Sequence, residues 1–161
     1  MKTKTILLAA GIMAASSPAW AIDVDRSTEV KASPDKVWAL IGDFCGIGDW
    51  HPAVEKCSLS DSAGISTRTL TLAGGGGTLV EALVSRDDAA MSYTYKIVDG
   101  PLPVANYVST ISVRDGDEPD ESEVSWTGTF DAKGAPDEKA TEVIAGIYES
   151  GLSALKQKAT Q

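Results

Sequence analysis

The hydrophobic and polar positions of the chain repeat with two different periods. Between residues 55 and 131 the period is two residues, as in strands with one buried face, and turn residues interrupt it at short intervals. This pattern predicts strands at residues 55–61, 66–73, 78–86, 91–98, 106–115 and 122–131. A preceding strand is predicted at residues 22–31, where Val24 and Val30 alternate with polar residues. The short connections favour an antiparallel sheet.

Helical periods flank this strand-rich region. Ser33, Pro34 and Asp35 form a typical helix start ahead of an apolar stripe, and a short helical turn is expected at residues 47–51. The longest helix is predicted after Pro136, with apolar residues at intervals of three and four: Ala140, Val143, Ile144, Ile147, Tyr148, Leu152 and Leu155. This order of elements buries both apolar faces when a strongly curved sheet wraps around the last helix, so the predicted class is α+β.

Composition limits the class of protein. The chain has 161 residues, of which 43% are hydrophobic and 23% charged, so we expect one globular domain rather than a disordered or disulfide-dense chain. Lys and Arg number 14 against 23 Asp and Glu, a net charge of -9. Such a surface repels phosphate groups, which argues against nucleic acid and anionic lipid as partners and favours an uncharged ligand or a cationic protein.

The N-terminus has the pattern of a secretory signal peptide. Lys2 and Lys4 precede an apolar stretch at residues 6–15, and Ala19-Trp20-Ala21 is a small-x-small cleavage site. The stretch is too short for a membrane span, so an uncleaved anchor is the weaker alternative. We therefore expect a domain of residues 22–161 in the periplasm, with a net charge of -11 (12 - 23) after cleavage.

The chain contains only two cysteines, Cys45 and Cys57. Their spacing matches neither a redox motif nor a zinc site. In an oxidising compartment a structural disulfide between them is favoured. Two buried free thiols are the alternative.

Several sequence features together resemble a known superfamily. The order of elements, the Ser33-Pro34-Asp35 helix start, the Asp49-Trp50-His51-Pro52 turn and the closing amphipathic helix resemble the START-like (SRPBCC) superfamily over nearly all of residues 22–158. This is the helix-grip fold of polyketide cyclases/dehydrases, birch-pollen-allergen-type proteins and plant abscisic-acid receptors. The resemblance implies a seven-stranded antiparallel sheet curved around the long helix, two short helices after the first strand, and a cavity between sheet and helix.

A narrower resemblance concerns the accessory proteins of methanol oxidation. Asp43-Phe44-Cys45, Trp50-His51-Pro52 and the loop at residues 100–103 look like those proteins, which are thought to help a periplasmic dehydrogenase work with its cytochrome. This likeness implies a basic periplasmic redox protein as a partner, with which an acidic surface is compatible.

Strand parity within the resembled fold predicts which residues line the cavity. The expected ligand contacts are Arg68, Leu70, Leu72, Glu81, Tyr95, Ile97, Tyr107, Trp126, Ile147 and Gly151. The expected rim residues are Trp50, His51, Gly75 and Leu102. By resemblance to the hormone receptors, residues 74–77 occupy the gate position and residues 99–103 the latch position. A slack hairpin is the alternative reading of the glycine run.

Two of these residues carry candidate chemistry. Glu81 lies within an apolar strand, so a buried carboxylate there needs a partner, and Arg68 on the preceding strand is the candidate. Glu81 is interpreted either as a structural or solvated residue or as a ligand contact or catalytic acid. His51 is the only histidine, which argues against a multi-histidine metal site. A structural or rim position is favoured for it over a general base.

Three functions remain open at this point. The first is an exported protein that binds a hydrophobic or amphipathic small molecule, without cofactor or metal, and that could assist a redox partner. The second is a cyclase or dehydratase-like enzyme with Glu81, His51 or Tyr95 as acid and base, because cyclases of this fold need few groups beyond a shaped pocket. The third is a protein-interaction module with a vestigial cavity. No specific catalytic residue is predicted.

Overall fold

The computed structural model of the chain describes residues 21–161. The predicted signal peptide lies outside the described residues except for Ala21, so its cleavage and the periplasmic location stay predictions. Among residues 21–161, no helix has the combination of length and apolar character that crossing a membrane requires.

The elements of the structure confirm the predicted α+β helix-grip fold. In chain order they are β1 (Ile22–Val30), α1 (Pro34–Ile41), α2 (Ile47–Trp50), β2 (Val54–Ser62), β3 (Ile65–Leu72), η1 (Ala73–Gly75), β4 (Gly77–Asp87), β5 (Ser92–Asp99), β6 (Val104–Asp115), β7 (Ser122–Ala132) and α3 (Asp137–Ala159). Every predicted strand end lies within two residues of the observed one. Turn residues and the period of two are therefore sufficient to locate these strands.

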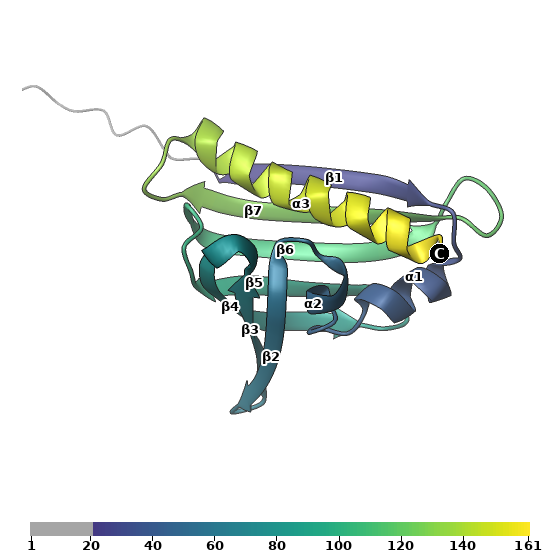
Figure 1. The fold of residues 1–161 in the computed structure, drawn as a ribbon, viewed down its shortest axis with the longest axis horizontal. Helices are drawn as coiled ribbons and strands as arrows, with labels where there is room; N and C mark the ends of the chain where they lie inside the picture. Colours follow the sequence, from purple (N-terminus) through teal and green to yellow (C-terminus); the bar gives the residue numbers. More distant parts are fainter. Residues whose placement is uncertain (1–20) are drawn as a thin grey trace, which may run out of the picture.

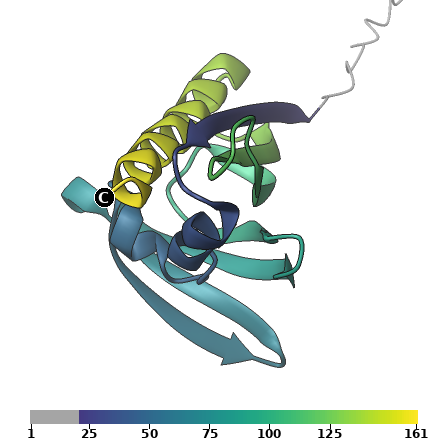
Figure 2. The same cartoon turned by 90° about the vertical axis from the view of Figure 1, so that its right-hand side faces the viewer.

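The seven strands form one antiparallel sheet in the order β1-β7-β6-β5-β4-β3-β2. Strands β2 to β7 follow one another as a meander, and β1 pairs with β7 at the opposite edge. The sheet is strongly curved, α3 lies along β1 and β7, and the β2–β3 hairpin projects away from α3 (Figures 1 and 2). Residues of strands β3 to β5 and of α3 line a cavity on the concave side of the sheet.

Helix α3 presents two kinds of apolar residue to the sheet. Ile144, Tyr148 and Leu155 are buried in the core, as the stripe predicts. Val143 and Ile147 belong to the same stripe but are only half-buried, because they face a cavity rather than packed side chains. The helix therefore closes the core along one part of its length and covers a cavity along another.

The glycine run after β3 forms a turn that only glycine adopts readily. Residues Ala73–Gly75 make a short 3-10 turn, which the sequence pattern does not predict. Gly74, Gly75 and Gly77 have φ angles of 64°, 74° and 93°, in the left-handed region that disfavours side chains. The backbone conformation of this turn thus explains why glycine occupies these three positions.

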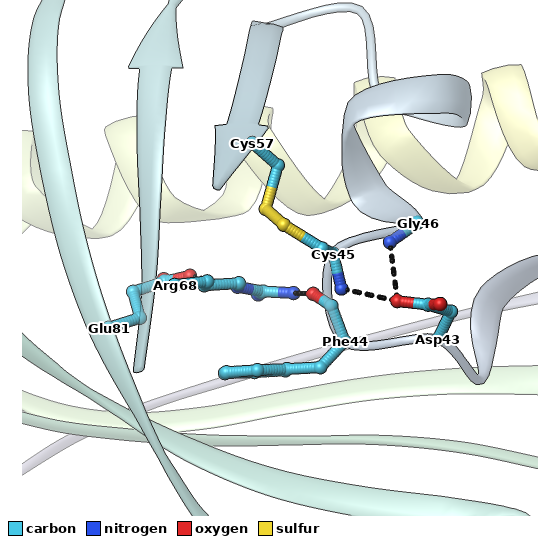
Figure 3. Close-up of a disulfide and its surroundings, with 7 residues drawn as sticks. All are labelled: Asp43, Phe44, Cys45, Gly46, Cys57, Arg68 and Glu81. Carbon is cyan, nitrogen blue, oxygen red and sulfur yellow. Dashed lines mark hydrogen bonds and ion pairs between the residues drawn. A yellow bond between two sulfur atoms is a disulfide. The ribbon is translucent and has the colours of Figure 1, made fainter. Parts of the chain in front are cut away.

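A disulfide joins Cys45 to Cys57, the pairing that the sequence favours (Figure 3). It connects the loop after α1 to strand β2, with a sequence separation of 12 residues. Closing a loop of this length in the unfolded chain stabilises the fold by about 2–3 kcal/mol in the chain-entropy model. The loop is also ordered by Asp43, whose Oδ1 accepts hydrogen bonds from the backbone N–H groups of Cys45 and Gly46. The disulfide and these hydrogen bonds therefore hold Phe44, which lies between Asp43 and Cys45, in a defined position.

Candidate functional site

A cavity of about 410 Å³ lies between the curved sheet and α3. Its wall is mostly apolar, and its residues come from α2 and the turn after it, strands β2 to β7, the turn between β3 and β4, the β5–β6 loop and α3. They are Ile47, His51, Ala53, Val54, Leu70, Leu72, Ala73, Gly76, Leu79, Glu81, Tyr95, Ile97, Pro101, Leu102, Pro103, Tyr107, Trp126, Val143, Ile144 and Ile147. Both the size and the composition are typical of a site for a small organic molecule.

Most of the residues that parity assigns to the cavity lie in its wall. These are Leu70, Leu72, Glu81, Tyr95, Ile97, Tyr107, Trp126 and Ile147 among the predicted contacts, and His51 and Leu102 among the predicted rim residues. Whether they touch a ligand stays a prediction.

Four of the predicted residues lie elsewhere. Arg68 is fully buried behind Glu81, and Gly151 lies against His51 and Trp126 rather than at the wall. Trp50 is not at the rim: it is buried in the core, with its ring 5.8 Å from that of Trp126. Gly75 is exposed, and the neighbouring Gly76 lines the cavity in its place.

Sequence reasoning missed the residues from α2 and the start of β2. Ile47, Ala53 and Val54 line the cavity because α2 packs against α3 and β2. The only signal for them is their position on either side of the Trp50-His51-Pro52 turn, which is itself predicted at the rim.

A buried ion pair joins Glu81 in the cavity wall to Arg68 behind it, and Figure 3 shows the two side chains. Arg68 Nε donates to Glu81 Oε2 at 2.7 Å, and Nη1 donates to the backbone carbonyl of Phe44. The guanidinium carbon lies 4.2 Å from the Phe44 ring centroid and 4.8 Å from that of Tyr95, which adds cation–π attraction. The loop held by the disulfide thus supplies both a carbonyl and an aromatic ring to Arg68.

The Glu81 carboxylate has one oxygen in this pair and one free. Burial raises the pKa of the Glu81 carboxyl above its usual value, and the charge and hydrogen bond of Arg68 oppose that shift. Glu81 lines the cavity, and its Oε1 accepts no hydrogen bond from the described residues. One anionic acceptor is therefore available to a molecule in the cavity.

A chain of hydrogen-bonded, buried hydroxyl groups connects β6 to α3. The Ser109 hydroxyl donates to the carbonyl of Thr127 at 2.7 Å, so its oxygen can only accept from Tyr148, 3.0 Å away. Tyr148 then accepts from Tyr107, whose hydroxyl oxygen is 2.6 Å from its own. The direction of every hydrogen bond in this chain is thereby determined.

Tyr95 differs from these hydroxyl groups. Its oxygen accepts from the Trp126 indole N–H at 3.0 Å, a donor that Trp126 shares with Ser109 Oγ at 3.0 Å, and Tyr95 donates no hydrogen bond to another described residue. Burial, followed by the charge of Glu81, raises the pKa of Tyr95 well above its ordinary value, so the hydroxyl stays protonated. Because Tyr95 lines the cavity, it offers a hydrogen-bond donor there.

His51 is held by hydrogen bonds at both ring nitrogens. Nδ1 accepts from the Ala53 backbone N–H, and Nε2–H donates to the Ile147 carbonyl, each at 3.1 Å. The side chain is buried, and this burial lowers the pKa of His51 to about 4. A neutral imidazole with both nitrogens occupied joins α2 to α3 and has no free lone pair for use as a general base.

Two glycines allow these aromatic groups to approach the backbone. A Cβ at Gly151 on α3 would lie 2.6 Å from His51 Cδ2 and 2.8 Å from Trp126 Cζ3. At Gly128 on β7, the place of a Cβ is taken by the Tyr148 hydroxyl. Neither glycine has a positive φ, so the constraint at both is steric.

We expect Gly151→Ala to lower the free energy of unfolding by about 1–3 kcal/mol, as overpacked core positions do. The matched control is Gly146→Ala on the same helix, where a Cβ would meet no atom within 4 Å. That variant should gain up to ~1 kcal/mol from helix propensity alone. Urea unfolding of both variants measures the difference, and equal stabilisation of both would contradict the packing role of Gly151.

The described residues contain no group of three or more His, Cys, Asp or Glu side chains placed to hold a metal ion. The lining residues with polar side chains are Glu81, Tyr95, Tyr107, His51 and Trp126.

Comparisons with known proteins agree with the fold. The family model described as polyketide cyclase / dehydrase and lipid transport matches residues 21–160. Among solved structures, an uncharacterised protein of Bacillus thuringiensis is 36% identical with a TM-score of 0.81, over 87% of this chain and 100% of that chain. The protein XoxI of Bacillus cereus is 38% identical with a TM-score of 0.81, over 86% and 96%.

A more distant structure shows the fold alone. The Zhui aromatase/cyclase of a Streptomyces species is 19% identical with a TM-score of 0.70, over 88% of this chain and 94% of that chain. The search of curated proteins found no significant match.

Proposed function

Because the chain belongs to the polyketide cyclase/dehydrase and lipid transport family, we propose that it binds a hydrophobic or amphipathic small molecule in the cavity beneath α3. The observation that carries this proposal is the cavity itself: about 410 Å³ of space, mostly apolar walls, and two polar groups with unused hydrogen-bonding capacity, Glu81 and Tyr95. A vestigial cavity in a pure interaction module would be expected to be filled by side chains.

The contacts of the candidate acid and base groups favour binding over catalysis. Both nitrogens of His51 are engaged, and burial raises the pKa of Tyr95 well above 10. Glu81 is held by Arg68 through one of its oxygens. An acid–base enzyme needs groups that exchange protons near neutral pH, and the environments of His51 and Tyr95 disfavour this.

Export and a redox role form the finer part of the proposal. The disulfide between Cys45 and Cys57 supports an oxidising compartment such as the periplasm. A role as an accessory of methanol oxidation rests on the residues quoted from the sequence. The basic redox partner stays a prediction that rests on net charge.

Native mass spectrometry of protein purified from the cells that produce it tests the binding function. We expect a retained small molecule in the wild-type protein. Val143→Trp, which fills the cavity from α3, should lose it, whereas Val108→Trp should keep it because Val108 is an exposed residue outside the cavity wall. Wild-type protein that carries no ligand and also fails to bind naphthalene, an apolar probe, would overturn the proposal.

A further inference from the structure

The polar groups at the cavity wall define a class of ligand. We propose that the cavity selects an uncharged molecule with a hydroxyl group, an alcohol or a phenol, over the carboxylate of the same carbon skeleton. This inference rests on the proposed binding function. The residues that make this choice are Glu81 and Tyr95, which face the cavity with one free acceptor and one free donor.

The acceptor at Glu81 is not masked by its partner. Arg68 is fully buried and lies outside the cavity wall, between Glu81, the Phe44 ring and the Tyr95 ring. A molecule in the cavity therefore meets the carboxylate oxygen and not the guanidinium. A ligand carboxylate would place two acceptors and a negative charge against Glu81, with no hydrogen to donate.

Glu81 and Tyr95 lie close enough for one ligand to reach both. Glu81 on β4 pairs with Ile97 on β5, and Tyr95 is two residues from Ile97 on the same face. Diagonal neighbours of this kind are roughly 7–8 Å apart at their Cα atoms. A single ligand hydroxyl group can both donate to Glu81 and accept from Tyr95. Alternatively, the hydroxyl donates to Glu81 while a second acceptor on the same ligand accepts from Tyr95.

A cationic ligand fits this site less well than a neutral one. Arg68 already neutralises the Glu81 charge at 2.7 Å, so the pair has little net charge left with which to attract a cation. Moving an ammonium group into an apolar cavity carries a large desolvation cost. A carboxylate that is already paired with Arg68 does not offset that cost. A neutral donor avoids that cost.

Calorimetric titration of the wild-type protein at pH 7 with three matched probes tests the selection. The probes are naphthalene, 2-naphthol and 2-naphthoate. We expect 2-naphthol to bind roughly 10–100-fold more tightly than naphthalene, the range for one hydrogen bond to a charged group. We expect 2-naphthoate to bind at least about 10-fold more weakly than 2-naphthol.

Variants assign the selection to the two residues. Tyr95→Phe keeps the ring over Arg68 and should reduce the preference for 2-naphthol over naphthalene. Glu81→Gln replaces the charge by an amide that can donate, so 2-naphthoate should gain affinity relative to 2-naphthol. Glu118→Gln, which removes an exposed charge from the β6–β7 loop, should leave all three affinities unchanged. That control separates the local carboxylate from the acidity of the whole surface.

The outcomes separate this inference from the function on which it rests. Binding of none of the three probes would overturn the proposed binding function, and the inference with it. If naphthalene or 2-naphthoate bound as tightly as 2-naphthol, the cavity would bind apolar ligands without the proposed selection. Because these arms use wild-type protein, they decide the question even if Glu81→Gln fails to fold.

Discussion

Glu81→Leu should lower the free energy of unfolding by about 3–5 kcal/mol, because it leaves the Arg68 guanidinium buried without an ionic partner. Arg68 has no exposed surface, and one of its nitrogens, Nη2, already lacks a partner among the described residues. The Phe44 carbonyl and the cation–π contacts would remain but carry no opposite charge. Urea unfolding measures the loss. Glu81→Gln should lose less, since its amide oxygen can still accept from Arg68.

The double variant Arg68→Met, Glu81→Leu is the informative control. Replacing a whole buried ion pair by apolar residues is often neutral or stabilising, so most of the lost stability should return. At the surface, Glu123→Gln breaks a pair with the exposed Arg114 and should cost much less than Glu81→Leu, because solvent screens that pair. A Glu81→Leu protein as stable as wild type would refute the proposed dependence of Arg68 on Glu81.

Stability should also fall by up to about 3 kcal/mol as the pH is lowered from 6.5 to 4, through His51 alone. Burial lowers the pKa of His51 in the folded protein to about 4, from 6.5 in the unfolded chain. Between these values the unfolded chain binds a proton that the folded protein does not, so the equilibrium shifts toward unfolding as pH falls. Above pH 6.5 both states are neutral and this contribution is fully present.

The matched variant for this effect is His51→Gln, which removes the only histidine of the chain. Its amide can accept from Ala53 and donate to Ile147, although with altered geometry. Acidic residues shared by both proteins contribute equally, so the difference between the two stability profiles isolates His51. Chemical unfolding at a series of pH values measures it. Parallel profiles would mean that His51 titrates normally and is not buried in solution.

Sequence patterns predict the fold and the pairing of Arg68 with Glu81 for the same physical reason. Side chains alternate across a strand, so parity assigns each residue to a face, and the two residues are direct partners in the β3–β4 register. Parity does not give depth. Arg68 is on the cavity face but lies under the wall, where Phe44 from a distant loop covers it.

The misplaced residues show where local patterns stop being informative. Trp50 is in the core because α2 packs between β2 and α3, a contact that depends on the assembled fold. Gly151 is on the helix face that parity selects, but His51 and Trp126 occupy the space beside it. Helix and strand periods say which side a residue faces, whereas its neighbours are determined by packing between elements distant in sequence.

The contact between Gly128 and Tyr148 has a consequence for the evolution of the chain. Because the tyrosine hydroxyl occupies the place of a Cβ on β7, the two positions cannot vary independently. A relative with alanine at position 128 is expected to have lost the hydroxyl at position 148, and the change at 148 should come first because phenylalanine there is compatible with glycine. The hydroxyl chain of Tyr107 and Ser109 would then lose its middle member. Divergence at one glycine can thus alter the polarity of the region behind the cavity.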